Sequence, residues 1–229
     1  MKKYEHLFFD LDRTLWDFEQ NSAETLTDLF IQHKLEESLK ISEHLFIETY
    51  KKKNDDLWAK YRKGVITKDS LRLERFHQTL CSFGLNDSEF ALSLNDGYVA
   101  ACSSKTNLIP YAKEVLDYLK PNYKLHVITN GFVEAQFVKI EKSGLKNYFD
   151  EVIVSDGLGY RKPDKRIFEY AFTKTKTNAK QGLMIGDDYV PDVLGARNVG
   201  MDQVYFNAEG EIKEATFCIS SLLELKAIL

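Results

Sequence analysis

The chain has 229 residues, of which 44% are hydrophobic and 29% are charged, and its formal net charge is −4 at pH 7. This composition is ordinary for a soluble globular protein, and the charge gives no general attraction to nucleic acid or to an anionic membrane. No run approaches the ~20 apolar residues needed to cross a bilayer, and the three cysteines form no CxxC pair. We therefore expect a cytoplasmic protein that binds neither nucleic-acid polymers nor membranes.

The first predicted element is an apolar strand over residues 4–10, which ends at Asp10 and is followed by a second carboxylate at Asp12. Such a run is typical of a buried parallel strand, and ligands bind at the carboxyl ends of these strands. Two acids crowded there repel each other unless a cation or a shared proton relieves them. The pair suits a metal-assisted reaction with one carboxylate as nucleophile and the other as acid and base. The common alternative is an Asp that merely caps the turn after a strand.

Residues 21–103 contain no convincing strand. Apolar residues recur there at helical spacing, as Leu26, Leu29 and Phe30 do. Gly64 is placed to end one helix and Thr67 to cap the next. The region predicts a helical insertion between the first strand and the rest of a sheet, and its position directly after a candidate catalytic strand suits a lid.

After residue 119, short apolar runs alternate with helix-length stretches, which is the βαβ pattern of a parallel sheet. Strands are predicted at residues 124–129, 151–155, 182–186 and 203–206, with an edge strand at 216–219. Crossover helices are predicted at 134–143 and 163–174, the second with Pro163 in its first turn. His126, inside an apolar strand, is predicted to be a packed residue with its hydrogen bonds satisfied.

Polar groups follow three of these strands. Thr129, Asn130 and Gly131 end one strand with a hydroxyl and backbone N–H groups that can hold anionic oxygens. Lys162 precedes a proline, and its ammonium could neutralise both a phosphate and a nearby aspartate. Each feature also has a bland interpretation, as a strand-end turn or as a solvated lysine.

The last strand end carries Asp187 and Asp188, with Asp192 about one helical turn further on. Carboxylate oxygens are ligands that Mg²⁺ prefers, although an Asp-rich turn without a metal is a fair alternative. The ends of parallel strands lie on one edge of a sheet, so one shared site is more probable than four unrelated turns.

In their order along the chain, Asp10–Thr14, Thr129, Lys162 and the segment 186–192 resemble the motifs of haloacid dehalogenase (HAD) superfamily phosphohydrolases. The resemblance extends over essentially the whole chain. It implies an α/β fold with a Rossmann-like parallel sheet and helices on both faces in residues 1–16 and 106–229. It also implies an inserted α-helical cap of the C1 type in residues 17–105. Arg13 departs from the glycine that the family most often has at this position.

The resemblance also implies roles for individual residues. Asp10 would attack phosphorus to form an aspartyl-phosphate, and Asp12 would act as acid and then as base. The phosphoryl group would be bound by Thr129, Asn130 and Lys162.

Mg²⁺ is the implied cofactor. It would be held by Asp10, Asp187 and the backbone carbonyl of Asp12, with Asp188 or Asp192 supporting these ligands. A carboxylate at Asp12 favours phosphoryl transfer over dehalogenation, because the dehalogenases of the superfamily need no leaving-group acid.

Within the superfamily, the segments 15–18, 58–64 and 129–131 resemble a subgroup of house-cleaning pyrimidine 5′-nucleotidases. This favours small phosphomonoesters, nucleoside 5′-monophosphates first, as substrates. Trp16 and Phe18 could stack on a nucleobase or simply seal the cap against the core. Arg62 and Lys63 could reach the substrate or complement a helix dipole.

Several alternatives stay open at this point. One is a sugar-phosphate or phosphoglycolate phosphatase, and another is a phosphomutase of the same fold. A third, of a different class, is a non-catalytic phosphate-binding or regulatory protein, against which the complete set of site residues argues. The chain is expected to be a monomer or a homodimer.

Overall fold

The computed structural model describes residues 3–210 and 213–229 and contains the predicted α/β fold. Residues 1, 2, 211 and 212, which the predicted core includes, lie outside the described residues. One parallel sheet has the order β3-β2-β1-β4-β5-β6. Its strands are β1 (His6–Phe9), β2 (Lys124–Thr129), β3 (Glu151–Val154), β4 (Gly182–Gly186), β5 (Asp202–Phe206) and β6 (Phe217–Ile219). Each lies within two residues of its predicted ends, and β6 is the edge strand that the sequence predicted.

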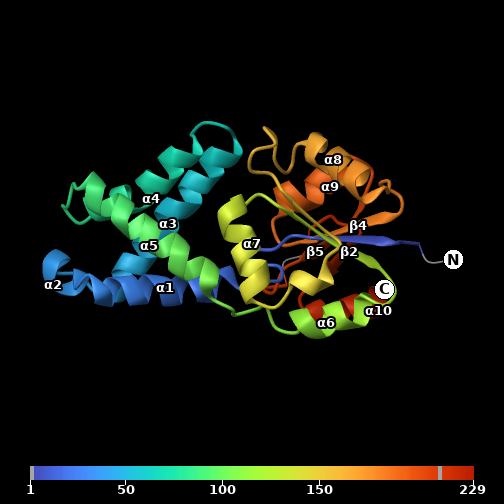
Figure 1. Ribbon diagram of the computed structural model, residues 1–229, viewed down its shortest axis with the longest axis horizontal. Coiled ribbons are helices and arrows are strands. Elements are labelled where there is room, and N and C mark those ends of the chain that lie inside the picture. The colour runs from blue at the N-terminus through green and yellow to red at the C-terminus, as the bar shows by residue number, and fades with distance from the viewer. Residues whose placement is uncertain (1–2, 211–212) are drawn as a thin grey trace. The chain divides into compact units, whose positions relative to one another are not determined.

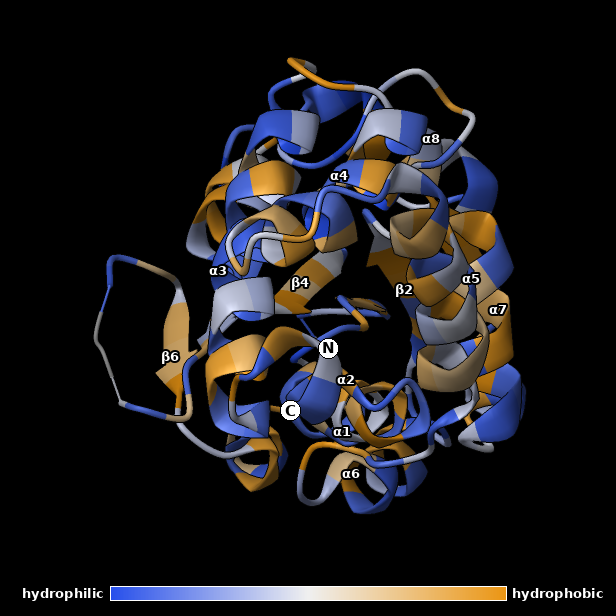
Figure 2. Ribbon diagram, turned by 90° about the vertical axis from the view of Figure 1, so that its left-hand side faces the viewer, coloured by the Kyte–Doolittle hydropathy of each residue, from blue (hydrophilic) through white to orange (hydrophobic). Residues whose placement is uncertain are grey.

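The central strands β1, β2 and β4 are buried on both faces, which explains their continuous apolar runs. In Figure 2, β2 and β4 are accordingly coloured mainly as hydrophobic. His126 of β2 is buried, and its Nε2 lies 3.0 Å from Nδ1 of His6. Among the described residues, however, no hydrogen-bond partner reaches Nδ1 of His126, and the His126 ring packs on that of Phe8 with centroids 4.9 Å apart. The prediction that His126 is packed is confirmed, but the prediction that its hydrogen bonds are satisfied was wrong for Nδ1.

Helices cover both faces of the sheet. In Figure 1, α8 and α9 lie on one side of it, and α6 and α10 lie on the other. The helical elements of this part of the chain are α6 (Ala112–Leu119), α7 (Val133–Lys142), η1 (Lys146–Tyr148), α8 (Lys165–Thr175), η2 (Tyr189–Leu194), α9 (Gly195–Arg197), η3 (Leu222–Glu224) and α10 (Leu225–Ile228).

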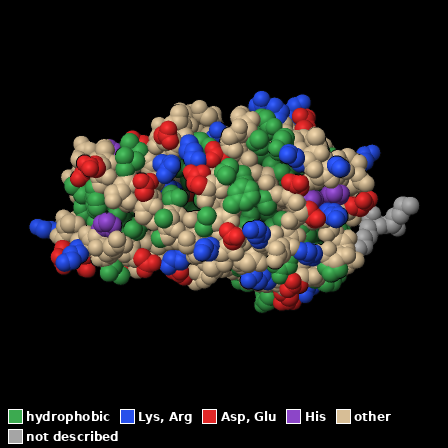
Figure 3. Space-filling model, in the orientation of Figure 1, with side chains coloured by type: hydrophobic (Ala, Val, Ile, Leu, Met, Phe, Trp, Pro, Cys, Tyr) green, Lys and Arg blue, Asp and Glu red, His purple; other side chains and the backbone are tan. Residues whose placement is uncertain are grey.

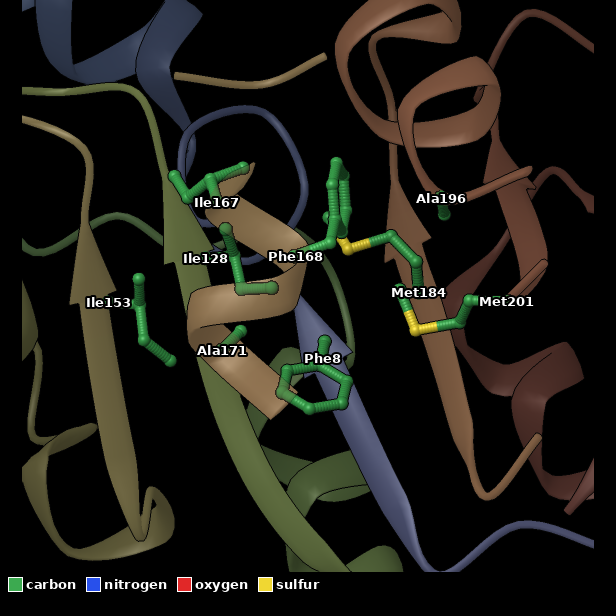
Figure 4. Close-up of a cluster of buried hydrophobic side chains, with 9 residues drawn as sticks. All are labelled: Phe8, Ile128, Ile153, Ile167, Phe168, Ala171, Met184, Ala196 and Met201. Atoms are coloured by element: carbon green, nitrogen blue, oxygen red, sulfur yellow. The ribbon is translucent and has the colours of Figure 1, made fainter. Parts of the chain in front are cut away.

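A buried apolar cluster joins α8 to the sheet (Figure 4). Phe8, Ile128 and Met184 come from three neighbouring strands, and Ile167 and Phe168 of α8 pack over them. Burial of apolar side chains of this size contributes on the order of 2 kcal/mol each. The cluster therefore holds the strands in register directly beneath the strand ends at which the polar groups collect.

The start of α8 differs from the prediction. The helix begins at Lys165, and the Asp164 side chain caps it by accepting a hydrogen bond from the backbone N–H of Arg166 at 2.9 Å. Pro163 precedes the cap and does not lie in the first turn. An aspartate at the N-cap satisfies an otherwise unpaired helix N–H, which a proline cannot do.

The chain divides into two compact units, one of residues up to 18 together with 105–229 and the other of residues 19–104. The second unit is helical, without a strand among its residues, as predicted. Its helices are α1 (Phe18–Gln32), α2 (Leu35–Leu39), α3 (Glu43–Arg62), α4 (Lys68–Cys81) and α5 (Ser88–Ser104).

Local signals set the ends of the helices in the second unit. Gly64 follows the end of α3 with a φ of 70°, in the left-handed region that favours glycine. The Thr67 hydroxyl accepts a hydrogen bond from the N–H of Ser70 at 3.1 Å and caps α4. Both predictions are confirmed. Inside the unit, the rings of Tyr50 and Phe76 pack with centroids 4.6 Å apart.

On the face drawn in Figure 3, acidic and basic side chains are interspersed. The three cysteines are free thiols. Within residues 3–210 and 213–229, no helix has both the length and the apolar character required to pass through a bilayer.

Candidate active site

The register of the sheet brings the candidate residues to one edge. Phe9, the last residue of β1, pairs with Val127 of β2 on one side and with Ile185 of β4 on the other. Asp10 therefore follows the central strand, and its backbone N–H donates to the Ile185 carbonyl at 2.9 Å. The other strand ends lie beside it, as the parallel topology requires.

Lys162 joins two buried carboxylates. Its Nζ lies 2.7 Å from Oδ1 of Asp10 and 2.6 Å from Oδ1 of Asp192, and its side chain is 2% exposed. A buried ammonium is stable only when it is paired and hydrogen-bonded, and these two contacts supply that. The lysine and the two aspartates therefore form one connected unit.

Asn130 holds the backbone of Lys162. Its Nδ2 donates to the Lys162 carbonyl at 2.8 Å, and its Oδ1 accepts from the Lys162 N–H at 2.9 Å. The end of β2 is thereby tied to the loop that carries the lysine. The amide of Asn130 is engaged in this clamp, whereas its role in binding phosphate stays a prediction.

The cluster has more carboxylates than ammonium groups, and burial affects the pKa of each. Burial raises the pKa of Asp10 to about 7, against the opposing effect of Lys162. Burial also raises the pKa of Asp192, again against Lys162. Burial alone would lower the pKa of Lys162, but the two aspartates outweigh it and raise that pKa. One ammonium does not neutralise the carboxylates around it, so the cluster favours a further cation.

Asp187 provides a third carboxylate. One oxygen each of Asp10, Asp187 and Asp192 lie within 4.8 Å of one another. Burial, reinforced by the charges of Asp10 and Asp192, raises the pKa of Asp187 well above its usual range, while a 2.8 Å hydrogen bond from the Thr14 hydroxyl opposes this.

This donor set fits Mg²⁺, which binds carboxylate oxygens and is usually held by only one or two of them. Asp192 has both oxygens engaged, one with Lys162 and one with the backbone N–H of Asp188 at 3.1 Å. Among the described residues, Oδ2 of Asp10 and Oδ2 of Asp187 have no hydrogen-bond partner, so these two oxygens suit a cation. The geometry thus gives Asp192 the task of holding Lys162 and Asp188.

Asp12 points to α7. Its Oδ1 lies 2.5 Å from Nζ of Lys139, and its Oδ2 accepts a 3.0 Å hydrogen bond from Nε2 of Gln136. The Asp12 side chain is 24% exposed, whereas that of Lys139 is 8% exposed. Neither Gln136 nor Lys139 was predicted to belong to the site. Their spacing of three residues places them on one face of α7, but helical spacing alone does not show that this face meets the site.

The aromatic residues after the first motif pack within the sheet unit. Trp16 is buried, and its indole N–H donates to the Lys105 carbonyl at 3.1 Å. Nζ of Lys139 lies 4.3 Å from the centroid of the Trp16 ring and 5.9 Å from that of Phe18. These contacts lie within one unit, so both interpretations of Trp16, sealing of the cap and stacking on a base, stay predictions.

The other residues that the sequence singled out lie at the ends of strands and helices or in the loop after β1. Thr129 ends β2 and is buried, and its hydroxyl accepts from the N–H of Gly131 at 3.2 Å. Arg13 has a φ of 66°, which explains why glycine is common there, and its guanidinium lies 4.6 Å from the Phe18 ring centroid. Arg62 ends α3 and Lys63 follows it in the other unit, so their role toward a substrate stays a prediction.

Comparison with known proteins shows which family the chain resembles. The family model for haloacid dehalogenase-like hydrolases matches residues 4–200. The pyrimidine 5′-nucleotidase YjjG of Escherichia coli is 32% identical over 99% of this chain and 98% of its own length. The pyrimidine 5′-nucleotidase PynA of Streptococcus pneumoniae is also 32% identical, over 89% of this chain and 84% of its own.

A solved structure is similar as well. The HAD-hydrolase YfnB of Bacillus subtilis, described as bound to magnesium, superposes with a TM-score of 0.90 and 29% identity. The match covers 100% of this chain and 99% of that one.

Proposed function

Because this chain belongs to the haloacid dehalogenase-like hydrolase family, we propose that it is a Mg²⁺-dependent phosphomonoesterase that hydrolyses nucleoside 5′-monophosphates, those of pyrimidines first. The observation that carries this proposal is the contact of Lys162 with Asp10 in a cluster that holds two more carboxylates, those of Asp187 and Asp192. The similarity to two pyrimidine 5′-nucleotidases supports the choice of substrate.

Asp10 is the nucleophile in the proposed reaction. One oxygen of its carboxylate attacks phosphorus, the bond from phosphorus to the ester oxygen breaks, and Asp12 protonates the leaving alkoxide. Water then attacks the phosphorus of the aspartyl-phosphate and gives a proton to Asp12. The bond between Asp10 and phosphorus breaks, so that phosphate is released and the Asp10 carboxylate is restored. Lys162 holds Asp10 in place and stabilises the negative charge of the phosphoryl group, together with the Thr129 hydroxyl.

Mg²⁺ would be held by Asp10, Asp187 and the carbonyl of Asp12, where it would offset the charge of the carboxylates and of the phosphoryl oxygens. Asp192 and Asp188 would support this arrangement through their contacts with Lys162 and with each other. The magnesium described for YfnB supports the choice of metal.

The test is phosphate release from a panel of nucleoside monophosphates, sugar phosphates and phosphoglycolate, with and without Mg²⁺. Asp10→Asn should lose at least about 10³-fold in kcat, because the nucleophile is removed. The control variant Asp56→Asn changes an exposed aspartate of α3 and should keep wild-type turnover. Excess EDTA should stop the reaction, and Mg²⁺ should restore it.

The panel also separates the alternatives. Preference for sugar phosphates or phosphoglycolate would keep the mechanism and refute the proposed substrate. Transfer of phosphate between sugars, without its release, would indicate a phosphomutase. A wild type that is inactive on every ester would refute the enzymatic proposal and favour a phosphate-binding protein.

A further inference from the structure

Two side chains of α7 occupy both oxygens of Asp12. Lys139 contacts Oδ1 at 2.5 Å and Gln136 donates to Oδ2 at 3.0 Å. The proposed reaction uses Asp12 but gives no task to either donor. Lys139 is 127 positions from Asp12 in the chain, so only the fold brings them together.

Lys139 is itself held from a second side. Its ammonium lies 4.3 Å from the ring centroid of Trp16, and aromatic faces attract cations electrostatically. A buried lysine that is fixed between a ring and a carboxylate has little freedom to leave that carboxylate. The fold therefore fixes the geometry of the contact between Lys139 and Asp12. A flexible ion pair on the surface, by contrast, contributes little to stability.

The position of the Gln136 side chain depends on Gly131, in the turn that follows β2. A Cβ atom on Gly131 would lie 1.8 Å from Nε2 of Gln136, so glycine at this position leaves room for the amide. The turn that carries Thr129 and Asn130 thereby also places the second donor to Asp12. One further atom of Gln136, its Oε1, is buried without a partner among the described residues.

We propose that Lys139, assisted by Gln136, is a positioning residue that holds the Asp12 carboxylate in the orientation needed for proton transfer. The inference rests on the proposed function, in which Asp12 exchanges a proton with the leaving group and with water. Proton transfer by a positioned side chain contributes about 10²–10⁴-fold, and much of that depends on orientation. Asp12 is partly exposed, so without its two donors its carboxylate can rotate toward solvent.

The test compares an alkyl ester, uridine 5′-monophosphate, with p-nitrophenyl phosphate, whose leaving group departs without needing a proton. Lys139→Met keeps the length of the side chain and removes its charge. We expect kcat/KM for uridine 5′-monophosphate to fall about 10–100-fold, and that for p-nitrophenyl phosphate to fall by less than about threefold. Lys139→Arg, which can still pair with a carboxylate, should recover part of the loss.

Two further variants complete the experiment. Lys142→Met changes an exposed lysine one turn further along α7 and should match wild type on both esters. In an Asp12→Asn background, Lys139→Met should cause no further loss on uridine 5′-monophosphate, because its effect passes through Asp12.

The outcomes separate this inference from the proposed function. Equal losses on both esters, or a further loss in the Asp12→Asn background, would overturn the positioning role and leave Lys139 as a packing residue. A large loss in Asp12→Asn with none in Lys139→Met would also overturn it, while the proposed function stands. Wild-type turnover by Asp12→Asn would instead refute the role of Asp12 in the proposed function itself.

Discussion

At the scale of single residues, Lys162 organises the candidate site. It is placed by Asn130, which clamps its backbone, and it contacts Asp10 and Asp192 with its ammonium. The sequence indicated Lys162 because it precedes a proline after an apolar strand. Its contact with Asp192 could not be predicted from the sequence, because the position of that carboxylate depends on how the turn after β4 is folded.

Removal of this ammonium should damage both folding and turnover. Lys162→Met leaves two buried carboxylates without their cation, which costs about 3–5 kcal/mol of unfolding free energy for a broken buried pair. Urea unfolding measures this loss, and phosphate release should fall below detection in the same variant. Lys165→Met, at an exposed position that starts α8, should stay within about 0.5 kcal/mol of wild type. An unfolding free energy unchanged by Lys162→Met would contradict the buried ion pairs described above.

At the scale of elements, Gly186 at the end of β4 lies directly against the side chain of Asp192 in η2. A Cβ atom on Gly186 would lie 2.3 Å from Oδ2 and 2.4 Å from Cγ of Asp192. Gly186 therefore leaves room for the carboxylate that holds Lys162. The sequence predicted both the strand and the acidic turn after it, but the requirement for glycine appears only once Asp192 folds back on the strand end.

Gly186→Ala should push Asp192 away from Lys162. We expect a loss of about 1–3 kcal/mol in unfolding free energy, as for other overpacked buried sites, together with at least about a tenfold loss of kcat from misplacement of Lys162. The control is Gly97→Ala in α5, where the added Cβ would meet only Leu29 at 3.4 Å. Thermal unfolding and phosphate release on the two variants check this prediction, and equal behaviour of both would refute it.

At the scale of the whole molecule, the sheet has different chemistry at its two ends. The carboxyl ends of β1 and β4 carry the acidic cluster, while near the amino ends His6 and His126 lie together with ring centroids 5.2 Å apart. Burial, assisted by the neighbouring His6, lowers the pKa of His126 to about 4, and burial also lowers the pKa of His6. The folded protein therefore keeps His126 uncharged at pH values where an unfolded chain would protonate it.

This difference predicts acid sensitivity. In the unfolded state His126 takes up a proton near the ordinary histidine pKa of about 6.5, whereas in the folded state it does so only near pH 4. The free energy of unfolding therefore falls as the pH drops from about 6.5 to about 4. Between pH 7 and pH 5 the histidine should remove about 2 kcal/mol of unfolding free energy. Chemical unfolding at both pH values should show a smaller drop in His126→Phe than in wild type. The variant His44→Gln, at an exposed position of α3, should retain the full drop, and an equal drop in His126→Phe would exclude His126 as the cause.

Much of the fold could be predicted from consecutive residues. Apolar runs determine which strands are buried, helical spacing determines the all-helical character of residues 21–103, and Gly64 and Thr67 mark the ends of neighbouring helices. Carboxylates directly after apolar strands determined the candidates Asp10 and Asp187, because the ends of parallel strands meet at one edge. These features depend on backbone preference and burial, which act over a few positions.

Contacts between distant residues needed the tertiary structure. The pairing of Lys139 with Asp12, the support of Asp187 by Thr14, and the choice of Asp192 as the partner of Lys162 join residues 127, 173 and 30 positions apart. Helical periodicity shows that α7 has a face toward the protein, but it does not show which carboxylate that face meets. The order and register of the strands decide this, because they set which loops become neighbours at the edge of the sheet.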